Sequence, residues 1–343
     1  MRQRLLGHSG TAVSTLALGT MTFGAESDEA TSHAILDAYA AAGGTLIDTA
    51  DVYSAGVSEE IVGRWLAANP DEADRMIVAT KGRFPMGEGA NDVGLSRRHL
   101  RRALSASLTR LGVDHIDLYQ FHAWDPLTPV EETLHFAEDA IRAGHIAYYG
   151  WSNLTGWQLA EIVHTARAMG VPQPVTLQPQ YNLLARELEF EVVPAAERYD
   201  VGLLPWGPLA GGWLTGKYTK DTRPSGATRL GEDPNRGMEA YDRKAGSART
   251  WAVLDVLTAV ADQVDASPAQ VALAWLVDRP AVTSVILGAR TVEQLEANMA
   301  AESVALSAEQ RAQLDAASEV HAPDYPYGEL GIEQRSRSLG SAR

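Results

Sequence analysis

The chain of 343 residues contains no cysteine. This absence excludes disulfides, thiolate catalysis, iron–sulfur clusters and cysteine-ligated zinc, and it is typical of a reducing compartment. The sequence also lacks any run of 18 apolar residues, and its first ten residues contain no uninterrupted apolar segment. We therefore expect neither a transmembrane helix nor a secretory signal, and the sequence indicates a soluble, cytoplasmic protein.

Basic residues are scarce. The 29 Lys and Arg residues face 44 Asp and Glu residues, which gives a formal net charge of −15. Such a chain repels phosphate backbones and anionic lipid surfaces, so we expect no nucleic-acid and no membrane partner. The content of 45% hydrophobic and 21% charged residues is that of a globular protein, which argues against a disordered or coiled-coil chain.

Short apolar or β-branched runs alternate with longer helical patterns along the chain. This alternation is typical of βα units around a parallel sheet. Eight runs are present, and they end near Gly19, Thr49, Thr80, His122, Ser152, Gln178, Trp206 and Gly288. Eight repeats in a chain of this length predict an α/β fold, a closed (β/α)8 TIM barrel that spans residues 1–343 as one domain.

Three segments depart from the repeat. Residues 4–19 place a turn-forming His-Ser-Gly between apolar runs, which predicts an N-terminal β-hairpin that plugs one barrel end. Residues 207–248 are rich in Gly with scattered Pro and predict a long loop after strand 7, and long loops in compact domains are often functional. Residues 321–343 predict an irregular C-terminal tail.

Helix starts are indicated by capping boxes, in which a Ser or Thr caps the third helical amide and a Glu or Gln reaches back. Pro129 and Pro268 are expected at the first helical position, where a missing N–H costs nothing. The predicted boxes are Thr128/Glu131, Thr155/Gln158, Ser267/Gln270, Thr291/Gln294 and Ser307/Gln310.

Ionisable residues stand at the ends of three consecutive predicted strands. Asp48, Lys81 and His122 end the second, third and fourth strands, and Tyr53 follows Asp48 by five residues. Each has an ordinary explanation alone: a capping Asp, a solvated Lys, a core His or a packed Tyr. Because active sites of barrels lie where strands end, their conjunction favours one shared site.

Seven motifs resemble those of the aldo-keto reductase family, in its bacterial branch, over essentially the whole chain, and they are also similar to those of potassium-channel β-subunits. They are ALGTMTFG at 17–24, LIDTADVY at 46–53, ATKG at 79–82, DLYQFH at 117–122, GWSN at 150–153, LQPQYN at 177–182 and GARTVEQLEAN at 288–298. The resemblance implies an NADPH-dependent oxidoreductase that reduces aldehydes and ketones to alcohols. It also implies a catalytic tetrad of Asp48, Tyr53, Lys81 and His122.

The chemistry of these side chains suits that reaction. Hydride addition to a carbonyl carbon leaves negative charge on the oxygen, so the site needs a proton donor, which Tyr53 can be. The ammonium of Lys81 should lower the pKa of the phenol toward the working range. Asp48 should keep a buried Lys81 charged, and His122 should orient the carbonyl by a hydrogen bond.

No side chain donates a hydride, so a cofactor is needed. The G-x-G-x-x-G fingerprint is absent, and the family binds its nicotinamide cofactor at the barrel mouth instead. By resemblance, Ser152, Asn153 and Gln178 hold the carboxamide and Trp206 stacks on the nicotinamide, although a core role for Trp206 is equally open. Thr20 and Asp48 are also expected to contact the cofactor.

The remaining cofactor contacts are expected from the loop after strand 7 and from the eighth strand. Backbone amides at Gly207, Leu209 and Gly211, with the cation of Lys217, would hold the pyrophosphate. Residues 211–217 nearly match a Walker A motif. Tyr218 stands where that motif has the Ser or Thr that binds magnesium, which excludes a nucleoside triphosphatase.

The eighth strand leads from Gly288 to Arg290, which is expected to pair with the 2′-phosphate. This pairing favours NADPH over NADH, and no metal is expected. Gln294 and Asn298 contact the adenosine by resemblance, and Gln294 is equally interpretable as the capping partner of Thr291.

The substrate pocket is expected to be lined by Met21, Phe23, Phe84 and Trp124, with Tyr325 and Tyr327 closing over it. Each is equally interpretable as loop packing. The partner is a small-molecule carbonyl compound, and the sequence predicts neither its identity nor the oligomeric state.

Two alternative functions remain at this stage. One is a cofactor-binding regulatory subunit resembling potassium-channel β-subunits. The other is a barrel aldolase with Lys81 as a Schiff-base amine. An aldolase of this kind would not need the motifs that the resemblance assigns to cofactor binding.

Overall fold

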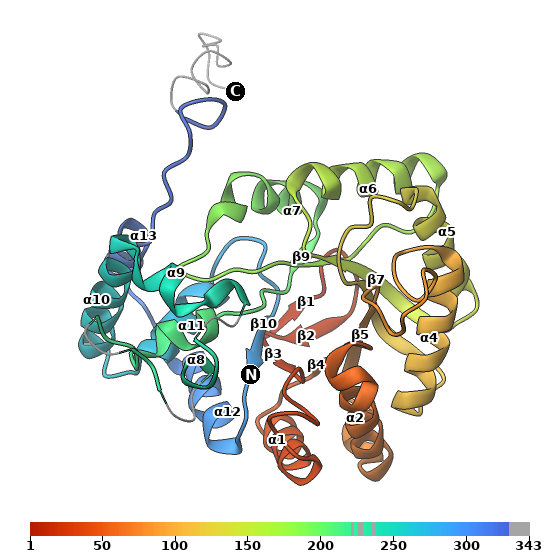
Figure 1. The fold of residues 1–343 in the computed structure, drawn as a ribbon, viewed down its shortest axis with the longest axis horizontal. Coiled ribbons are helices and arrows are strands. Elements are labelled where there is room, and N and C mark those ends of the chain that lie inside the picture. The colour runs from red at the N-terminus through yellow and green to blue at the C-terminus, as the bar shows by residue number, and fades with distance from the viewer. Residues whose placement is uncertain (221–222, 226–228, 235–236, 329–343) are drawn as a thin grey trace.

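A parallel barrel forms the centre of the computed structural model, which describes residues 1–220, 223–225, 229–234 and 237–328 (Figure 1). Its strands are hydrogen bonded in the order β10-β3-β4-β5-β6-β7-β8-β9. They are β3 (Leu16–Gly19), β4 (Leu46–Asp48), β5 (Ile77–Gly82), β6 (Ile116–Phe121), β7 (Ile146–Ser152), β8 (Thr176–Gln178), β9 (Gly202–Leu203) and β10 (Val285–Gly288). All eight predicted runs are therefore strands.

The two ends of this strand order meet beside the short strand β9. Leu203 forms a parallel bridge with Val282, and the amide of Leu203 donates to the carbonyl of Ala281 at 2.8 Å. One step further along, the Ile286 amide donates to the carbonyl of Pro205 at 3.0 Å. These bonds close the sheet, which confirms the predicted (β/α)8 barrel.

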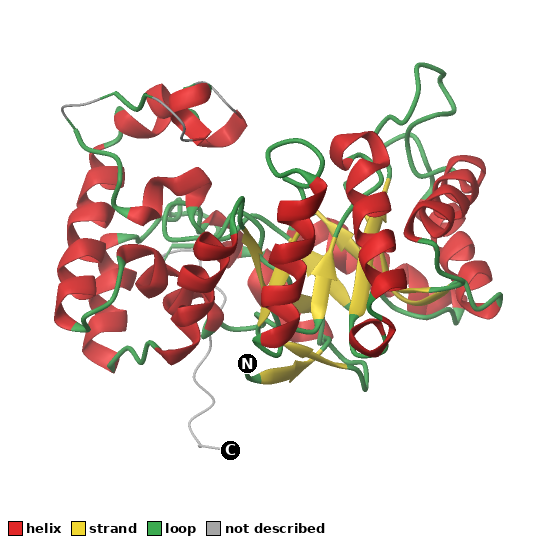
Figure 2. Cartoon of the chain, turned by 90° about the horizontal axis from the view of Figure 1, so that it is seen from below, coloured by secondary structure: helices red, strands yellow, loops and turns green. Residues whose placement is uncertain are grey.

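An antiparallel hairpin precedes the barrel and covers the end at which the strands begin (Figure 2). It consists of β1 (Gln3–Leu5) and β2 (Ala12–Ser14), closed by a bond from the Leu6 amide to the Thr11 carbonyl at 2.8 Å. The side chains of Leu6 and Val13 are fully buried in a small cluster with the inward-facing residues of the strands. The predicted plug is therefore confirmed.

Helices surround the strands, as Figure 1 shows. The longer ones are α1 (Glu29–Ala41), α2 (Val57–Ala68), α4 (Arg97–Leu111), α5 (Val130–Arg142), α6 (Gly156–Met169), α7 (Val192–Tyr199), α10 (Ala248–Gln263), α11 (Pro268–Val277), α12 (Val292–Met299) and α13 (Ala308–Ala317). Short elements are α3 (Pro70–Ala73), α8 (Arg229–Glu232), α9 (Tyr241–Ala245) and the 3₁₀ turns η1 (Tyr53–Gly56), η2 (Glu187–Phe190), η3 (Ala210–Thr215), η4 (Gly237–Glu239) and η5 (Ala300–Ser303).

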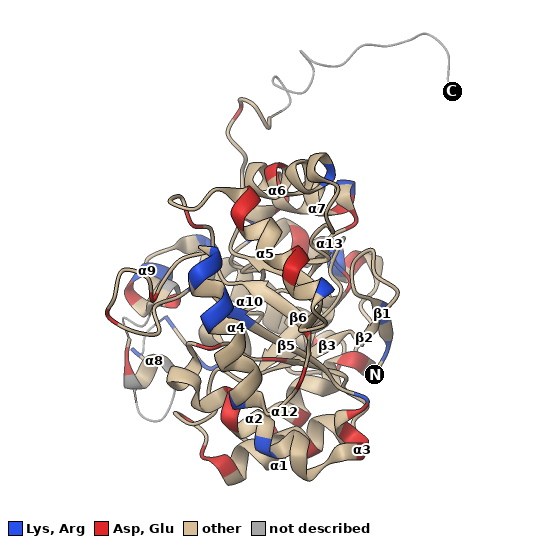
Figure 3. Cartoon of the chain, turned by 90° about the vertical axis from the view of Figure 1, so that its right-hand side faces the viewer, with Lys and Arg blue, Asp and Glu red and all other residues tan. Residues whose placement is uncertain are grey.

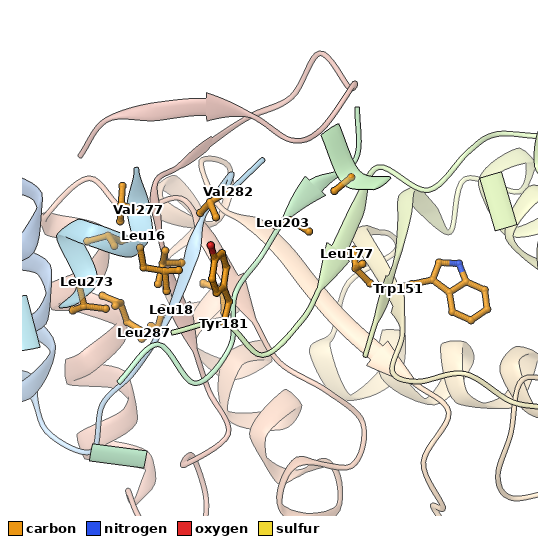
Figure 4. Packing of buried hydrophobic residues seen from close by; sticks show 14 of the residues in the cluster. Leu16, Leu18, Trp151, Leu177, Tyr181, Leu203, Leu273, Val277, Val282 and Leu287 are labelled. Atoms are coloured by element: carbon orange, nitrogen blue, oxygen red, sulfur yellow. The ribbon is translucent and has the colours of Figure 1, made fainter. Parts of the chain in front are cut away.

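The main core lies between the barrel and its helices. Figure 4 shows Leu273 and Val277 of α11 close to Leu16, Leu18 and Leu287 of the barrel strands. Each of these side chains is at most 2% exposed, and full burial of such a side chain contributes about 1.5–3 kcal/mol. Packing of this kind positions the strand ends, where the polar residues lie.

Three predicted capping boxes are confirmed, at the starts of α6, α11 and α13. Pro268 occupies the first turn of α11, as expected. The box at Thr291 is only half formed. The Thr291 side chain accepts from the amide of Gln294, while the Gln294 side chain accepts from the amide of Arg290 instead of the Thr291 amide.

The predicted box Thr128/Glu131 is wrong. Helix α5 begins at Val130, and Pro129 is its N-cap rather than its first helical residue. The Thr128 hydroxyl donates to Asp125 Oδ2 at 2.7 Å, so a nearby carboxylate takes the group that was expected to cap the helix.

The long connection after β9 is confirmed, and it is partly helical, with η3, α8, η4 and α9. Buried Trp213 anchors it by stacking on Tyr241, with ring centroids 5.4 Å apart, and by an edge contact with Trp251 at 5.7 Å. The described part of the tail, residues 321–328, contains no helix or strand. Positions 221–222, 226–228, 235–236 and 329–343 lie outside the described residues, and the assignment of 1–343 to one domain stays a prediction.

Surface charge is distributed unevenly. Figure 3 shows Lys and Arg gathered on α4, whereas Asp and Glu are spread over the other helices in view. The first two turns of α4 carry Arg97, Arg98, Arg101 and Arg102. The acidic net charge therefore coexists with a local basic face on α4.

Candidate active site

Four ionisable side chains meet at the end of the barrel opposite the hairpin. Asp48 is the last residue of β4, Lys81 lies near the end of β5, and His122 directly follows β6. Tyr53 opens η1, the turn that connects β4 to α2. Because parallel neighbours share one carboxyl end, the strands bring these residues together, as the sequence predicted.

Lys81 is the centre of this group, and its side chain is completely buried. Its Nζ donates to Asp48 Oδ2 at 2.6 Å, to the Thr49 carbonyl at 2.8 Å and to the Tyr53 hydroxyl at 3.1 Å. These three acceptors use all three ammonium protons. The ammonium is therefore held in one place between a carboxylate and a phenol.

The second oxygen of Asp48 is held by two amides. Oδ1 accepts from Gln120 Nε2 at 3.0 Å and from Gln178 Nε2 at 2.8 Å. The sequence interpretation missed Gln120, although strand alternation places it on the same face as His122. Gln178 was expected to hold a cofactor carboxamide, and its amide nitrogen orients Asp48.

His122 lies beside two aromatic rings. Its ring centroid is 5.9 Å from that of Tyr53 and 4.6 Å from that of Phe84. Burial, followed by the positive charges of Lys81 and Arg83, lowers the pKa of His122 to about 2. The imidazole is therefore neutral, and its Nδ1 has no hydrogen-bond partner among the described residues.

The pKa of Tyr53 departs from the expected direction. Burial raises the pKa of the phenol, and the opposing effect of the Lys81 ammonium does not offset it, so the net shift is upward. The expected lowering by the Lys81 ammonium is present, but it does not bring the pKa toward the working range, because the sequence does not show how strongly the fold desolvates the phenol. Burial also opposes the charge on Lys81, but Asp48 and then Tyr53 reverse this effect and raise the pKa of Lys81.

Asn153 and Trp206 form a connected pair at the mouth. Trp206 Nε1 donates to Asn153 Oδ1 at 3.0 Å, and Asn153 Nδ2 donates to the His122 carbonyl at 3.1 Å. Asn153 has a φ of 57°, a left-handed conformation that Asn tolerates well. Trp206 is only partly buried, so it is not a core residue. Ser152 is buried, and its hydroxyl donates to the Gln178 carbonyl at 2.8 Å.

The segment after β9 turns sharply at glycines. Gly207, Gly211, Gly212 and Gly216 have φ values of 63°, 64°, 98° and 78°. The φ of Gly212 is one that L side chains rarely adopt, which favours glycine there, and Lys217 Nζ would lie 2.6 Å from a Cβ at this position. Leu209 is partly buried against the core. A tight turn with backbone amides and a lysine is a donor set that suits an anion.

The turn after β10 is held by Glu26 and by two residues of α12. Arg290 Nε lies 2.5 Å from Glu26 Oε2, and the Arg290 amide donates to Gln294 Oε1 at 2.9 Å. Asn298 Nδ2 donates to the carbonyl of exposed Gly288 at 3.5 Å. Gln294 and Asn298 therefore hold the turn that presents Arg290.

The residues expected to line the substrate pocket differ in how far they are buried. Met21 is 43% exposed, Phe84 packs on His122, and Trp124 lies partly exposed between Trp151 and Trp157. Phe23 is fully buried in the core cluster, so its expected place in the pocket lining is wrong. The reason is that the turn after β3 directs this ring inward, which residue type alone does not show.

Three further residues were expected near the cofactor or the substrate, and the structure shows what surrounds each of them. Thr20 is fully buried, and its hydroxyl bonds to the Asp48 carbonyl and to Ser58 Oγ. Tyr327 stacks on Phe190 and donates to Glu191, whereas Tyr325 is 71% exposed. Closure of the tail over the mouth stays a prediction.

Arg83 is a mouth residue that the sequence interpretation missed. It has a φ of 151°, donates from Nη2 to the Trp124 carbonyl at 3.1 Å, and lies over the Phe84 ring at 5.2 Å. Its position directly after the ATKG motif was the available signal.

Within the part of the chain that the structure describes, no group of three His, Asp or Glu side chains could hold a metal ion. Among the described helices, none combines the length and apolar composition that crossing a bilayer requires.

Comparison with known proteins gives consistent matches. A sequence model of the aldo/keto reductase family matches residues 15–319. The uncharacterized oxidoreductase YrpG of Bacillus subtilis is 37% identical, with 90% of this chain and 93% of the relative covered. A probable voltage-gated potassium channel subunit beta of Oryza sativa is 37% identical, with 88% and 91% covered. The versiconal hemiacetal acetate reductase of Aspergillus parasiticus is 32% identical, with 90% and 95% covered.

Proposed function

This chain belongs to the aldo/keto reductase family, and we propose that it reduces small aldehydes or ketones to alcohols with NADPH as the hydride donor. Membership makes the protein an oxidoreductase of carbonyl compounds, and members of the family generally use a nicotinamide cofactor. The choice of NADPH and the role of each residue are the proposal.

The contact of Lys81 Nζ with the Tyr53 hydroxyl at 3.1 Å is the observation that carries it. An ammonium can only donate, so the phenol oxygen accepts and its own proton remains free for another acceptor. In the proposal, Tyr53 gives this proton to the substrate oxygen as negative charge develops there. The phenolate that remains is stabilised by the ammonium beside it.

Asp48 and His122 support the same step. Asp48 balances the charge of buried Lys81 and is itself held by Gln120 and Gln178, so the ammonium cannot turn away. His122 is neutral, and a neutral imidazole can hydrogen bond to the carbonyl oxygen without competing as an acid. Phe84 packs against the imidazole and restricts its orientation.

The residues at the mouth fit a nicotinamide dinucleotide, which supplies the hydride when bound. In the proposal, Trp206 offers a partly exposed indole face, while Ser152, Asn153 and Gln178 stand beside it for the carboxamide. The glycine turn at 207–216 and Lys217 offer amides and a cation for the pyrophosphate. Arg290 binds the 2′-phosphate, which favours NADPH over NADH, and Gln294 and Asn298 hold its turn and contact the adenosine.

The direct test is consumption of NADPH and of NADH with a panel of aromatic and aliphatic aldehydes, beside fluorescence titration of each cofactor. Turnover with NADPH supports the proposal. Absence of both turnover and cofactor binding would refute it.

A second candidate, a regulatory subunit that binds the cofactor, is favoured by the rice relative named as a potassium channel subunit. Tight NADPH binding without turnover across the panel would support this candidate over the enzyme. An aldolase is disfavoured, because Lys81 is completely buried and ion paired with Asp48, whereas a Schiff-base lysine must be neutral. The proposal also includes a cytoplasmic location, a single domain, and no nucleic-acid or membrane partner.

A further inference from the structure

A second group of buried ionisable residues lies behind the catalytic strand β5, between the barrel wall and helices α2 and α4. It consists of Asp51, Glu59, Arg110 and Tyr119, and the side chains of Asp51, Glu59 and Tyr119 are completely buried. The Asp51 amide donates to the Lys81 carbonyl at 3.1 Å, so this group is attached directly to the catalytic lysine.

The two carboxyl groups in this cluster have different surroundings. Glu59 Oε1 accepts from the Thr80 hydroxyl at 2.5 Å, and Oε2 accepts from Arg110 Nε at 2.7 Å. Among the described residues, no hydrogen bond of ordinary geometry reaches either oxygen of the Asp51 side chain or the Tyr119 hydroxyl, although the backbone amide of Val52 lies near enough to favour the charged form of Asp51. An ionised carboxylate that is buried with so little hydrogen bonding is unfavourable, and Glu59 has both a hydroxyl donor and an arginine, so Asp51 is the weakest place for a negative charge.

Charge balance points to the same residue. The catalytic group and this cluster together contain three buried carboxyls, of Asp48, Asp51 and Glu59, against the cations of Lys81 and Arg110. Full ionisation would leave one uncompensated negative charge in a desolvated region. Asp48 and Glu59 are each ion paired and hydrogen bonded, so the remaining proton belongs on Asp51.

The neighbouring charges act on Asp51 in opposite directions. Burial and the negative charge of Glu59 raise the pKa of Asp51 to about 7, while Arg110, the backbone amide of Val52 and Lys81 oppose this shift. Tyr119 stays neutral because burial, with the charges of Asp51 and Glu59, raises its pKa well above the ordinary value. The charge of Asp51 also acts on Tyr53 and raises the pKa of that phenol.

We propose that Asp51 holds the last proton of this buried cluster and that its charge state sets how readily Tyr53 donates a proton to the substrate. The inference rests on the proposed carbonyl reduction. Asp51 does not touch the reacting atoms, so it is a positioning residue that acts through Tyr53 and Lys81.

The direction of the effect follows from the charges. While Asp51 is protonated, the field of Lys81 on Tyr53 is undiminished and the phenol is the stronger acid. Once Asp51 loses its proton, its negative charge makes Tyr53 a weaker acid, and carbonyl reduction slows. The rate should therefore pass through an inflection near neutral pH that belongs to neither Tyr53 nor His122.

The test compares kcat and KM against pH for the wild type, Asp51→Asn and the control Asp71→Asn, which changes an exposed carboxyl of α3. We expect wild-type kcat to fall about fivefold through the inflection. Asp51→Asn should keep the acid-side kcat and lack the inflection, with KM unchanged, and the control should match the wild type. An unaltered inflection in Asp51→Asn overturns the proposal.

Glu59→Gln provides a second variant should Asp51→Asn fail to fold. Removal of the neighbouring negative charge should move the inflection to lower pH, whereas a merely structural role would change kcat at every pH. An inflection that stays in place in Glu59→Gln contradicts the proposal.

An infrared difference spectrum of the holoenzyme separates this inference from the proposed function. We expect the carbonyl band of a protonated carboxyl at about pH 6 to be lost by about pH 8 in the wild type. The band should be missing in Asp51→Asn. In Glu59→Gln the band should be present and should be lost at a lower pH than in the wild type. This readout needs no turnover, so an inactive protein with the band refutes only the reaction, and absence of the band from the wild type refutes the role of Asp51.

Discussion

Arg290 Nε lies 2.5 Å from Glu26 Oε2, so the cation proposed for the cofactor 2′-phosphate is already held by a carboxylate. Glu26 belongs to the loop between β3 and α1, and both side chains are about one-fifth exposed. A phosphate that binds Arg290 must share the guanidinium with this carboxylate or displace it. The pair therefore bears directly on the balance between NADPH and NADH.

Replacement of Arg290 by Ala should weaken NADPH binding more than NADH binding. A charge-assisted contact with a phosphate is worth about 1.5–3 kcal/mol, which corresponds to a loss of about tenfold or more for NADPH alone. Fluorescence titration of both cofactors measures the difference. An equal loss for both would remove Arg290 from this role.

Replacement of Glu26 by Gln should act in the opposite direction. The amide keeps the size of the side chain and removes the charge that repels a phosphate, so NADPH affinity should rise about threefold while NADH affinity stays nearly constant. The same titrations serve as the measurement. Weaker NADPH binding in this variant would show that Glu26 positions Arg290 rather than competing for it.

Replacement of Tyr53 by Phe should reduce carbonyl reduction by at least about 100-fold, because general acid catalysis of this kind contributes that much or more. Binding of NADPH should stay nearly unchanged, since the phenol is proposed to act on the substrate. Steady-state kinetics and a cofactor titration on the same preparation check both statements. Unchanged turnover would exclude Tyr53 as the proton donor.

Replacement of Lys81 by Met should destabilise the fold by about 3 kcal/mol, because it leaves Asp48 as an uncompensated buried charge. The double variant Asp48→Asn with Lys81→Met should recover most of this loss, although neither variant should be active. Urea unfolding of the three proteins gives the comparison. A double variant as unstable as the single one would show that packing, rather than charge, dominates here.

Asp51 should make stability depend on pH. Its pKa rises from the ordinary 3.8 to about 7 on folding. Its contribution to the free energy of unfolding is therefore fully present below pH 3.8 and is lost as the pH rises through 7. Asp51→Asn should therefore be more stable than the wild type at pH 8, by about 4 kcal/mol, and this advantage should shrink toward pH 4. Unfolding curves across this range are the measurement, and an advantage independent of pH would contradict the shifted pKa.

Local patterns accounted for most of the architecture. The eight strand runs, the hairpin and three capping boxes follow from periodicity and short spacings, and the structure confirms them. The failures are also local in origin. Thr128 bonds to Asp125 instead of capping α5, and Phe23 turns into the core, because competing partners and ring direction are not visible in residue type.

The meeting of Asp48, Lys81 and His122 at one end of the barrel could be predicted from the chain, since each lies at or near a strand end and parallel strands end together. The resemblance to the family grouped Tyr53 with them as a tetrad, and the catalytic roles of the four residues stay a proposal. The net upward shift of the Tyr53 pKa could not be predicted from the chain, because it depends on how much water the folded mouth excludes. The same holds for the contact of Arg290 with Glu26 and for the lack of a side-chain partner at Asp51 among the described residues. These features arise from segments far apart in the chain, and only packing of the complete barrel decides which charges meet and which stay alone.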